Sequence, residues 1–215
     1  LKDRFIKEYG LQDNVLRQKG YIMEGDFAYR KEKNLKKALE WYNQAFYCTV
    51  SFDAKKKEEM QLFSKEELKL SIRIAELLME IGEMEKAEQH LWEIKSYITI
   101  FPKKSDKANE EAKLYYYLAV FLFERKEYQE VWDYLEKSAA LLSRMKGFTI
   151  QGDLFFYRAR TLEALYQKGN EWNTVKNKAL RDFITAYYVY EFQENKEKCD
   201  WIQEHVRENY EWQNI

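Results

Sequence analysis

The segment Lys69–Lys95, KLSIRIAELLMEIGEMEKAEQHLWEIK, decides the fold of this chain. Both halves are rich in Leu, Ile, Ala, Met and Glu, yet Gly82 stands between them. Inside a helix a glycine costs about 1 kcal/mol relative to alanine, so its position here predicts a turn between two helices. The segment therefore indicates a helical hairpin, with Ala75 as a small residue in the first helix and Ala87 in the second.

The same pattern of small and large residues recurs in three further stretches, so four units are visible. These are YIMEGDFAYRKEKNLKKALEWYNQAF (Tyr21–Phe46), KLYYYLAVFLFERKEYQEVWDYLEKSAALLSRM (Lys113–Met145) and GDLFFYRARTLEALYQKGNEWNTVKNKALRDFITAYYVY (Gly152–Tyr190). The small residue of the first helix is, in chain order, Gly25, Ala75, Ala119 and Ala159, and Lys126 takes the turn position of the third unit. The spacing resembles the tetratricopeptide consensus, in which small residues let paired helices approach closely.

We therefore predict an all-α fold, a right-handed solenoid of about four to five tetratricopeptide-like hairpins with a C-terminal capping helix. One domain, residues 1–215, would contain units at 13–50, 64–98, 107–146 and 149–194 and a cap at 195–215. With only 7 Gly and 1 Pro, the chain has too few turn residues for an all-β fold. A different all-α bundle is the alternative, because amphipathic helices of any bundle share part of this pattern.

The units are longer than ordinary tetratricopeptide repeats, whose period is about 34 residues. Equivalent second-helix positions are separated by 49 residues from Ala38 to Ala87, by 44 to Val131 and by 48 to Ala179. We expect the extra residues in connections at Ser51–Ser64, Thr99–Lys107 and Gln167–Lys178. Ser64 and Glu67 form a predicted capping box that starts the next helix, and Asn195–Tyr210 is the predicted capping helix.

Composition excludes several classes of function. The net charge is −1, so no overall basic field favours nucleic acid or an anionic membrane. Cys48 and Cys199 lack CxxC spacing and are interpreted as free thiols of a reducing compartment. No apolar run approaches the roughly 20 residues that span a bilayer. We expect a soluble, cytoplasmic protein without direct nucleic-acid or membrane binding.

No catalytic constellation is recognisable. His90 and His205 lack a partner at metal-ligand spacing, and no phosphate-binding glycine motif or GxSxG is present. The many Asp and Glu residues are expected on solvated helix faces, since 34% of the residues are charged. We predict no enzyme activity, no cofactor and no metal site.

Stacked hairpins curve, and the first helix of each hairpin lines the concave side. Counted from the small residue of each unit, the predicted peptide-binding positions are Asp26, Tyr29, Glu76, Met79, Glu80, Tyr116, Phe123, Glu124, Phe156, Arg160 and Glu163. This set combines aromatic side chains with both signs of charge, as a surface selective for a short peptide would. The alternative is that some of these rings only pack against the neighbouring unit.

The closing segment Gly152–Ile202, GDLFFYRARTLEALYQKGNEWNTVKNKALRDFITAYYVYEFQENKEKCDWI, resembles the final repeat and cap of a known family. The family comprises the C-terminal receptor domains of Gram-positive bacterial peptide-pheromone regulators, the Rap, NprR and PlcR type. The stretched units and the abundance of Lys, Glu, Tyr and Ile resemble the same family. The resemblance implies quorum-sensing regulation, in which a short reimported peptide binds in the groove and alters the curvature or dimer arrangement of the solenoid. In this family, groove asparagines commonly hold the peptide backbone, whereas Asn109 and Asn173 are expected here in connections.

Two hypotheses follow for function. The first is a regulatory domain that binds a short peptide, as part of a cytoplasmic peptide-responsive transcription regulator, and that could also form a homodimer. The second is a general protein-interaction scaffold or assembly module without a small-peptide ligand.

Overall fold

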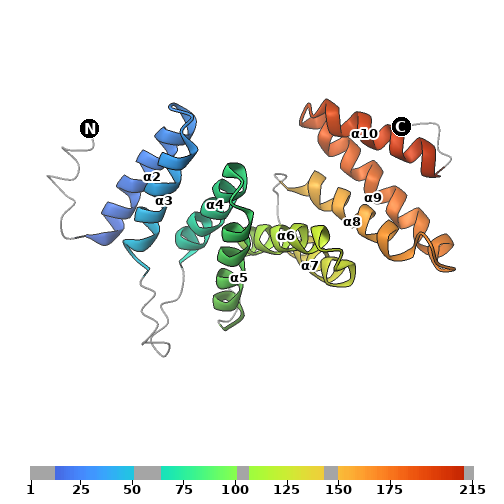
Figure 1. Ribbon diagram of the computed structural model, residues 1–215, viewed down its shortest axis with the longest axis horizontal. Coiled ribbons are helices and arrows are strands. Elements are labelled where there is room, and N and C mark those ends of the chain that lie inside the picture. The colour runs from blue at the N-terminus through green and yellow to red at the C-terminus, as the bar shows by residue number, and fades with distance from the viewer. Residues whose placement is uncertain (1–12, 51–63, 101–106, 143–149, 211–215) are drawn as a thin grey trace. The chain divides into compact units, whose positions relative to one another are not determined.

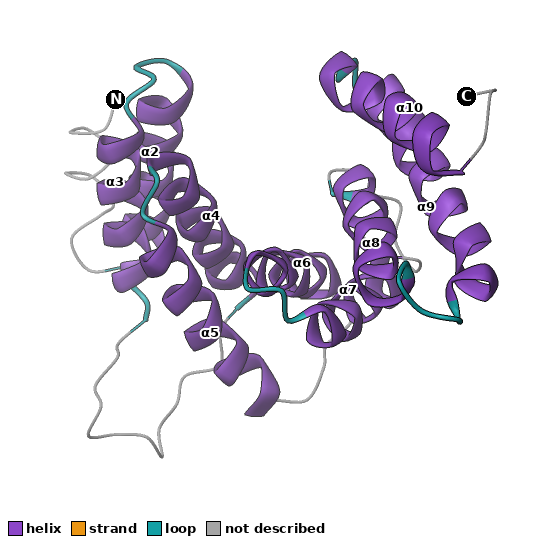
Figure 2. Cartoon of the chain, turned by 45° about the vertical axis from the view of Figure 1, so that its right-hand side comes forward, coloured by secondary structure: helices purple, strands orange, loops and turns teal. Residues whose placement is uncertain are grey.

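The computed structural model describes residues 13–50, 64–100, 107–142 and 150–210, and every regular element among them is helical (Figure 2). The helices are α2 (Asn14–Arg30), α3 (Leu35–Tyr47), α4 (Lys65–Ile81), α5 (Met84–Ile100), α6 (Ala108–Glu124), α7 (Tyr128–Leu142), α8 (Gln151–Tyr166), α9 (Trp172–Phe192) and α10 (Lys196–Tyr210). Not one of these described helices combines the length and apolar composition that crossing a bilayer requires.

The chain divides into two compact units, Leu1–Glu110 and Glu111–Ile215. In the first unit α2 pairs with α3 and α4 with α5, and α3 packs against α4, so the two hairpins are stacked (Figure 1). In the second unit α7 packs against α8, α8 pairs with α9, and α10 packs on α9. The Ser138 hydroxyl donates to the carbonyl of Ala112 at 2.8 Å and joins α7 to α6.

The helix ends that were predicted from local chemistry are confirmed. The Ser64 hydroxyl accepts from the Glu67 amide at 3.2 Å, and the Glu67 carboxylate accepts from the Ser64 amide at 2.6 Å, which forms the capping box of α4. Gly82 ends this helix with φ of 89°, and its amide donates to the Met79 carbonyl at 3.0 Å. Left-handed backbone is the conformation that favours glycine at the end of a helix.

Other hairpins make the same left-handed turn without glycine. Positive φ values occur at Lys33 (54°), Lys126 (64°) and Glu194 (57°), which connect α2 to α3, α6 to α7 and α9 to α10. Lys126 was predicted at the turn, and its position is confirmed. The turn that Gly82 marks in the sequence is therefore a repeated feature that other residue types also adopt.

Small residues bring the paired helices together, as predicted. Ala75, Ala119 and Ala159 in the first helices are fully buried, as are Ala87 and Ala179 in the second helices. The predicted all-α architecture of tetratricopeptide-like hairpins with a C-terminal capping helix is confirmed. Its organisation as a single domain stays a prediction.

The pairing of two hairpins depends on a glycine that faces a tyrosine ring. A Cβ atom built on Gly25 would lie 2.6 Å from Cε1 of Tyr42, and one built on Gly152 would lie 2.8 Å from Cε1 of Tyr190. The residue after each glycine is an aspartate that accepts the tyrosine hydroxyl, at 2.5 Å for Asp26 and at 2.7 Å for the second pair. The dipeptide Gly-Asp thus marks the same packing device in both units.

The structure corrects three expectations about connections. The connection predicted at Gln167–Lys178 is shorter, because α9 begins at Trp172, and Asn173 is therefore helical. Trp172 contacts Tyr210, with ring centroids 5.8 Å apart, which stabilises the added turn. Asn109 likewise lies in a helix, α6.

The connection predicted at Thr99–Lys107 starts later than expected, because α5 continues to Ile100. The lone proline, Pro102, and residues 51–63 of the connection predicted at Ser51–Ser64 lie outside the described residues.

Candidate peptide-binding surface

The eleven predicted positions all lie on the first helices of the hairpins, five on α2 and α4 of the first unit and six on α6 and α8 of the second. Glu80 and Glu124 are exposed, and Tyr116 and Glu163 are buried. The remaining positions are half-buried, namely Asp26, Tyr29, Glu76, Met79, Phe123, Phe156 and Arg160. Half-buried side chains can be held in place by the protein and still reach a partner.

In the first unit, three predicted residues surround Arg73, which the sequence pattern did not select. The guanidinium carbon of Arg73 lies 4.1 Å from the centroid of the Tyr29 ring. Its Nη1 atom lies 3.1 Å from a carboxylate oxygen of Glu76 and 3.9 Å from one of Glu80. The Tyr29 hydroxyl donates to Glu80 at 3.4 Å. We call these four residues the Arg73 cluster; they join α2 to α4.

Asp26 lies on the same helix as Tyr29, where it accepts the hydroxyl of Tyr42. Burial, the hydrogen bond to Asp26 and the charge of that carboxylate raise the pKa of Tyr42 to about 12. The phenol therefore stays protonated and donates throughout the neutral range. This bond fixes the Asp26 carboxylate beside the first helix of the unit.

In the second unit, Tyr157 connects predicted residues of α6 to α8. Its ring centroid lies 6.1 Å from that of Tyr116 and 5.3 Å from that of Phe123, both in edge-to-face geometry. Such ring pairs contribute about 0.5–1.5 kcal/mol beyond the burial of area. The sequence pattern selected Phe156 and missed its neighbour Tyr157, although the aromatic pair was visible.

Phe156 and Arg160 on α8 meet Trp201 of α10. The Phe156 and Trp201 rings are 5.1 Å apart, and the Arg160 guanidinium carbon lies 5.1 Å from the Trp201 centroid. Trp201 also stacks on His205 at 4.6 Å with an interplanar angle of 12°. Trp201 lies in the predicted cap, and no feature of the repeat pattern marked it as a site residue.

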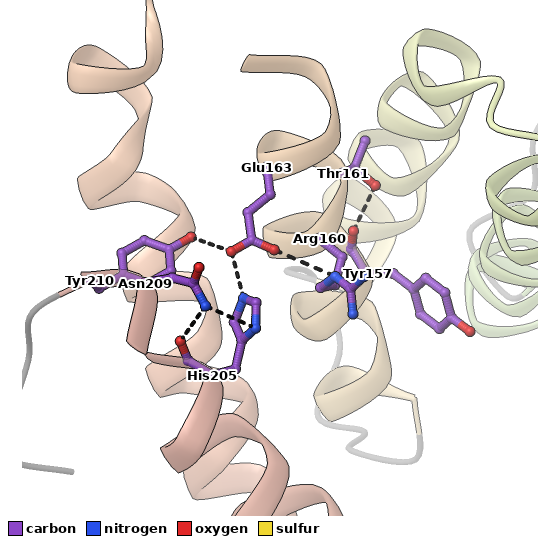
Figure 3. A network of polar contacts seen from close by, with 7 residues as sticks. All are labelled: Tyr157, Arg160, Thr161, Glu163, His205, Asn209 and Tyr210. Atoms are coloured by element: carbon purple, nitrogen blue, oxygen red, sulfur yellow. Dashed lines mark hydrogen bonds and ion pairs between the residues drawn. The ribbon is translucent and has the colours of Figure 1, made fainter. Parts of the chain in front are cut away.

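Glu163 is the centre of a network that fastens α10 to α8 (Figure 3). Its Oε1 atom accepts from the Tyr210 hydroxyl at 2.9 Å and lies 2.7 Å from Nε2 of His205. Its Oε2 atom lies 3.4 Å from Nε of Arg160. Burial first, and then the charge of Glu163, raises the pKa of Tyr210. We call Arg160, Glu163, His205 and Tyr210 the Glu163 network.

Three contacts at successive levels place α10 beside α8. Asp153 pairs with Lys198 near the start of both helices, Phe156 contacts Trp201, and Glu163 contacts His205. The adjacent side of α10 buries Cys199, Ile202, Val206 and Tyr210 in the core of the unit. The capping helix therefore occupies the place that the first helix of a further hairpin would take.

Seven of the eleven predicted residues contact one of three that the pattern missed, Arg73, Tyr157 and Trp201. Met79 is half-buried on α4, and the charge of exposed Glu124 acts on Tyr157. Within the described ranges, no group of three or more His, Cys, Asp and Glu residues could hold a metal ion. The role of the eleven positions in peptide binding stays a prediction.

Comparison with known proteins bears on the fold. No protein-family profile and no curated protein matches the chain. Among solved structures, Bacillus thuringiensis PlcR in complex with the peptide PapR7 and DNA is similar, with a TM-score of 0.52, 15% identity and coverage of 94% of this chain and 72% of PlcR. BtubC from P. vanneervenii is similar with a TM-score of 0.51, 16% identity and coverage of 100% and 72%. The expected resemblance to the PlcR type is confirmed at the level of the fold.

Proposed function

We propose that this chain is a non-enzymatic regulatory domain that binds a short peptide or a protein segment on the first helices of its hairpins. It would be part of a cytoplasmic, peptide-responsive bacterial regulator. The observation that carries the proposal is that predicted positions converge on aromatic and charged clusters that are half-buried and fixed by their neighbours. Binding energy at interfaces is concentrated in such aromatic and arginine side chains.

Two further observations support a peptide as the partner. The clusters join successive first helices, α2 with α4 and α6 with α8, so they follow the direction in which an extended chain would lie across the hairpins. The fold is also shared with PlcR, which was solved with a bound peptide. The repeat pattern and the fold therefore favour the same class of ligand.

Calorimetry with a library of synthetic heptapeptides tests the proposal. Tyr157→Ala removes a ring that contacts both Tyr116 and Phe123, and we expect it to weaken binding about tenfold or more. The matched control is Tyr188→Ala, because Tyr188 is an exposed aromatic residue on α9. If no peptide binds, or if both variants bind as the unmodified protein does, the proposal is wrong.

A scaffold is the second candidate, and one feature of α9 favours it. Tyr188 and Phe192 are exposed four residues apart on one side of the helix, and Phe192 is 86% exposed. Exposed aromatic side chains of this kind are common at protein interfaces. Light scattering would show a stable dimer or larger complex, and Phe192→Ser would dissociate it if this surface forms the contact.

A further inference from the structure

Arg160 on α8 uses one edge and one face of its guanidinium group within the unit. The recorded ion pair uses Nε, which faces Glu163, and the planar group lies over the ring of Trp201. Within the part of the chain that the structure describes, Nη1 and Nη2 form no hydrogen bond or ion pair with another side chain. The side chain is 36% exposed, so this outer edge can be reached from solvent.

The inner edge of Arg160 is firmly positioned. Glu163 is only 6% exposed, and its other oxygen is held by His205 and Tyr210 (Figure 3). Trp201 is held in turn by its stack on His205. A guanidinium group that is oriented on one edge and one face loses little freedom when it binds a ligand with its other edge.

Arg158, two residues earlier on the same helix, provides a comparison. It is 12% exposed and pairs with Glu136 at 3.2 Å and with Asp182 at 3.3 Å. Glu136 lies on α7 and Asp182 on α9, so the charge of this arginine is paired within the unit. Arg160 is the arginine of α8 that retains capacity for an external acceptor.

We propose that Arg160 binds a carboxylate of the peptide, either the C-terminal group or an Asp or Glu side chain. This inference rests on the proposed function and names the chemistry of the ligand. The paired terminal nitrogens of arginine match the two oxygens of a carboxylate. Because the Glu163 carboxylate lies 3.4 Å from Nε of Arg160, a singly charged acceptor meets less repulsion there than a doubly charged phosphate.

Three heptapeptide libraries distinguish the sources of the carboxylate. The first has free C-terminal acids and lacks Asp and Glu, the second has C-terminal amides and lacks Asp and Glu, and the third has C-terminal amides with one Glu. Selection on the intact protein followed by mass spectrometry ranks the bound peptides. We expect the first or the third library to bind about tenfold tighter than the second.

Variants of the arginine complete the test. Arg160→Gln is expected to abolish the preference for the carboxylate, and Arg160→Lys to retain part of it, since lysine keeps the charge without the paired geometry. Arg181→Gln is the matched control, because Arg181 is exposed on α9, and it should leave the preference unchanged. Thermal unfolding followed by circular dichroism confirms that each variant is folded.

The outcomes separate this inference from the proposed function. Equal binding of all three libraries would overturn the carboxylate assignment and leave peptide binding intact. A preference that survives in Arg160→Gln, or displacement of the peptide by inorganic phosphate at lower concentration than by acetate, would also overturn it. Failure of every library to bind would reject both proposals.

Discussion

Each unit of the molecule carries an Arg-x-x-Glu pair on a first helix, and the two units use it in opposite ways. In the first unit the arginine is saturated, because Arg73 contacts Glu76, Glu80 and the Tyr29 ring. In the second unit the glutamate is saturated, because Glu163 contacts His205 and Tyr210 as well as its arginine. The first unit therefore holds two carboxylates around one guanidinium group, and the second leaves a guanidinium edge.

The neighbouring helix decides which member of such a pair is surrounded by further contacts. Helix α2 supplies an aromatic ring that covers Arg73, whereas α10 supplies donors that occupy Glu163. The backbone packing of the two units is otherwise alike, since Gly25 faces Tyr42 in one and Gly152 faces Tyr190 in the other. The comparison predicts similar responses to changes in packing and different responses to changes in charge.

The largest effect is expected when a side chain is added to either packing glycine. Gly25→Val and Gly152→Val would each press a β-branched side chain into a buried tyrosine ring, and overpacking of this kind costs up to about 3 kcal/mol. Urea titration followed by circular dichroism measures the loss in free energy of unfolding. Gly20→Ala is the control, since nothing lies within 4 Å of its added Cβ, and it should stabilise α2 slightly. A large loss in the free energy of unfolding for only one of the two valine variants would contradict the similar packing of the two units.

Neutralising the two glutamates tests the difference in charge. Glu163→Gln should cost about 2 kcal/mol, because hydrogen bonds to a charged group are lost in a buried site. Glu76→Gln should cost less than about 1 kcal/mol, because the ion pair is partly exposed and Glu80 remains near Arg73. The same urea titrations give both values. Equal losses in the free energy of unfolding would contradict the proposed difference between the two Arg-x-x-Glu pairs.

Removing the tyrosine hydroxyls is expected to lower the free energy of unfolding by less, and this loss should depend on pH. Tyr42→Phe should cost about 1.5 kcal/mol at neutral pH, and Tyr190→Phe about 1 kcal/mol, because Asp153 keeps its bond to Lys198. The folded pKa of Tyr42, about 12, exceeds the value near 10 of an unfolded tyrosine. Its contribution is thus complete below pH 10 and is lost as pH rises towards 12. An unchanged slope of stability against pH in Tyr42→Phe would contradict this assignment.

The smallest effect on stability is expected when His90 of the first unit is replaced. Its Nε2 atom lies 2.9 Å from the Ser71 hydroxyl, and burial lowers its pKa. A depressed pKa favours the neutral ring, so this contribution is complete above about pH 6.5, the value for an unfolded histidine, and is lost as pH falls through the folded pKa. Between pH 7.5 and pH 5.5, the free energy of unfolding should fall more for the unmodified protein than for His90→Gln. An equal fall in both proteins would rule out His90 as the cause of the pH dependence.

Sequence reasoning succeeded where a local rule determines the structure. Gly82 ends a helix, Ser64 and Glu67 cap one, and the three reference alanines are buried, because turn geometry, capping and close packing each require particular residue types. The beginning of α9 was missed because Lys168, Gly169 and Asn170 suggest a loop. The contact of Trp172 with Tyr210 forms across 38 residues, and spacing within one helix cannot reveal it.

The candidate site was predicted only in part, because spacing within one helix does not reveal contacts between helices. Counting from a reference alanine selects positions on one helix, and these positions do lie on first helices. The side chains that organise them come from elsewhere: Arg73 lies two residues before its reference alanine, and Trp201 lies in the cap. Long arginine and tryptophan side chains reach neighbouring helices, so their partners depend on tertiary packing.

Substitutions in the left-handed turns should also make the protein more stable. Lys33, Lys126 and Glu194 adopt a conformation that costs a residue with a Cβ about 1 kcal/mol or more, whereas Gly82 adopts it freely. Glycine at these three positions should raise the melting temperature by a few degrees each. All three lie at hairpin ends, and none belongs to the Arg73 cluster or the Glu163 network, so the engineered protein would suit crystallisation trials with weakly bound peptides.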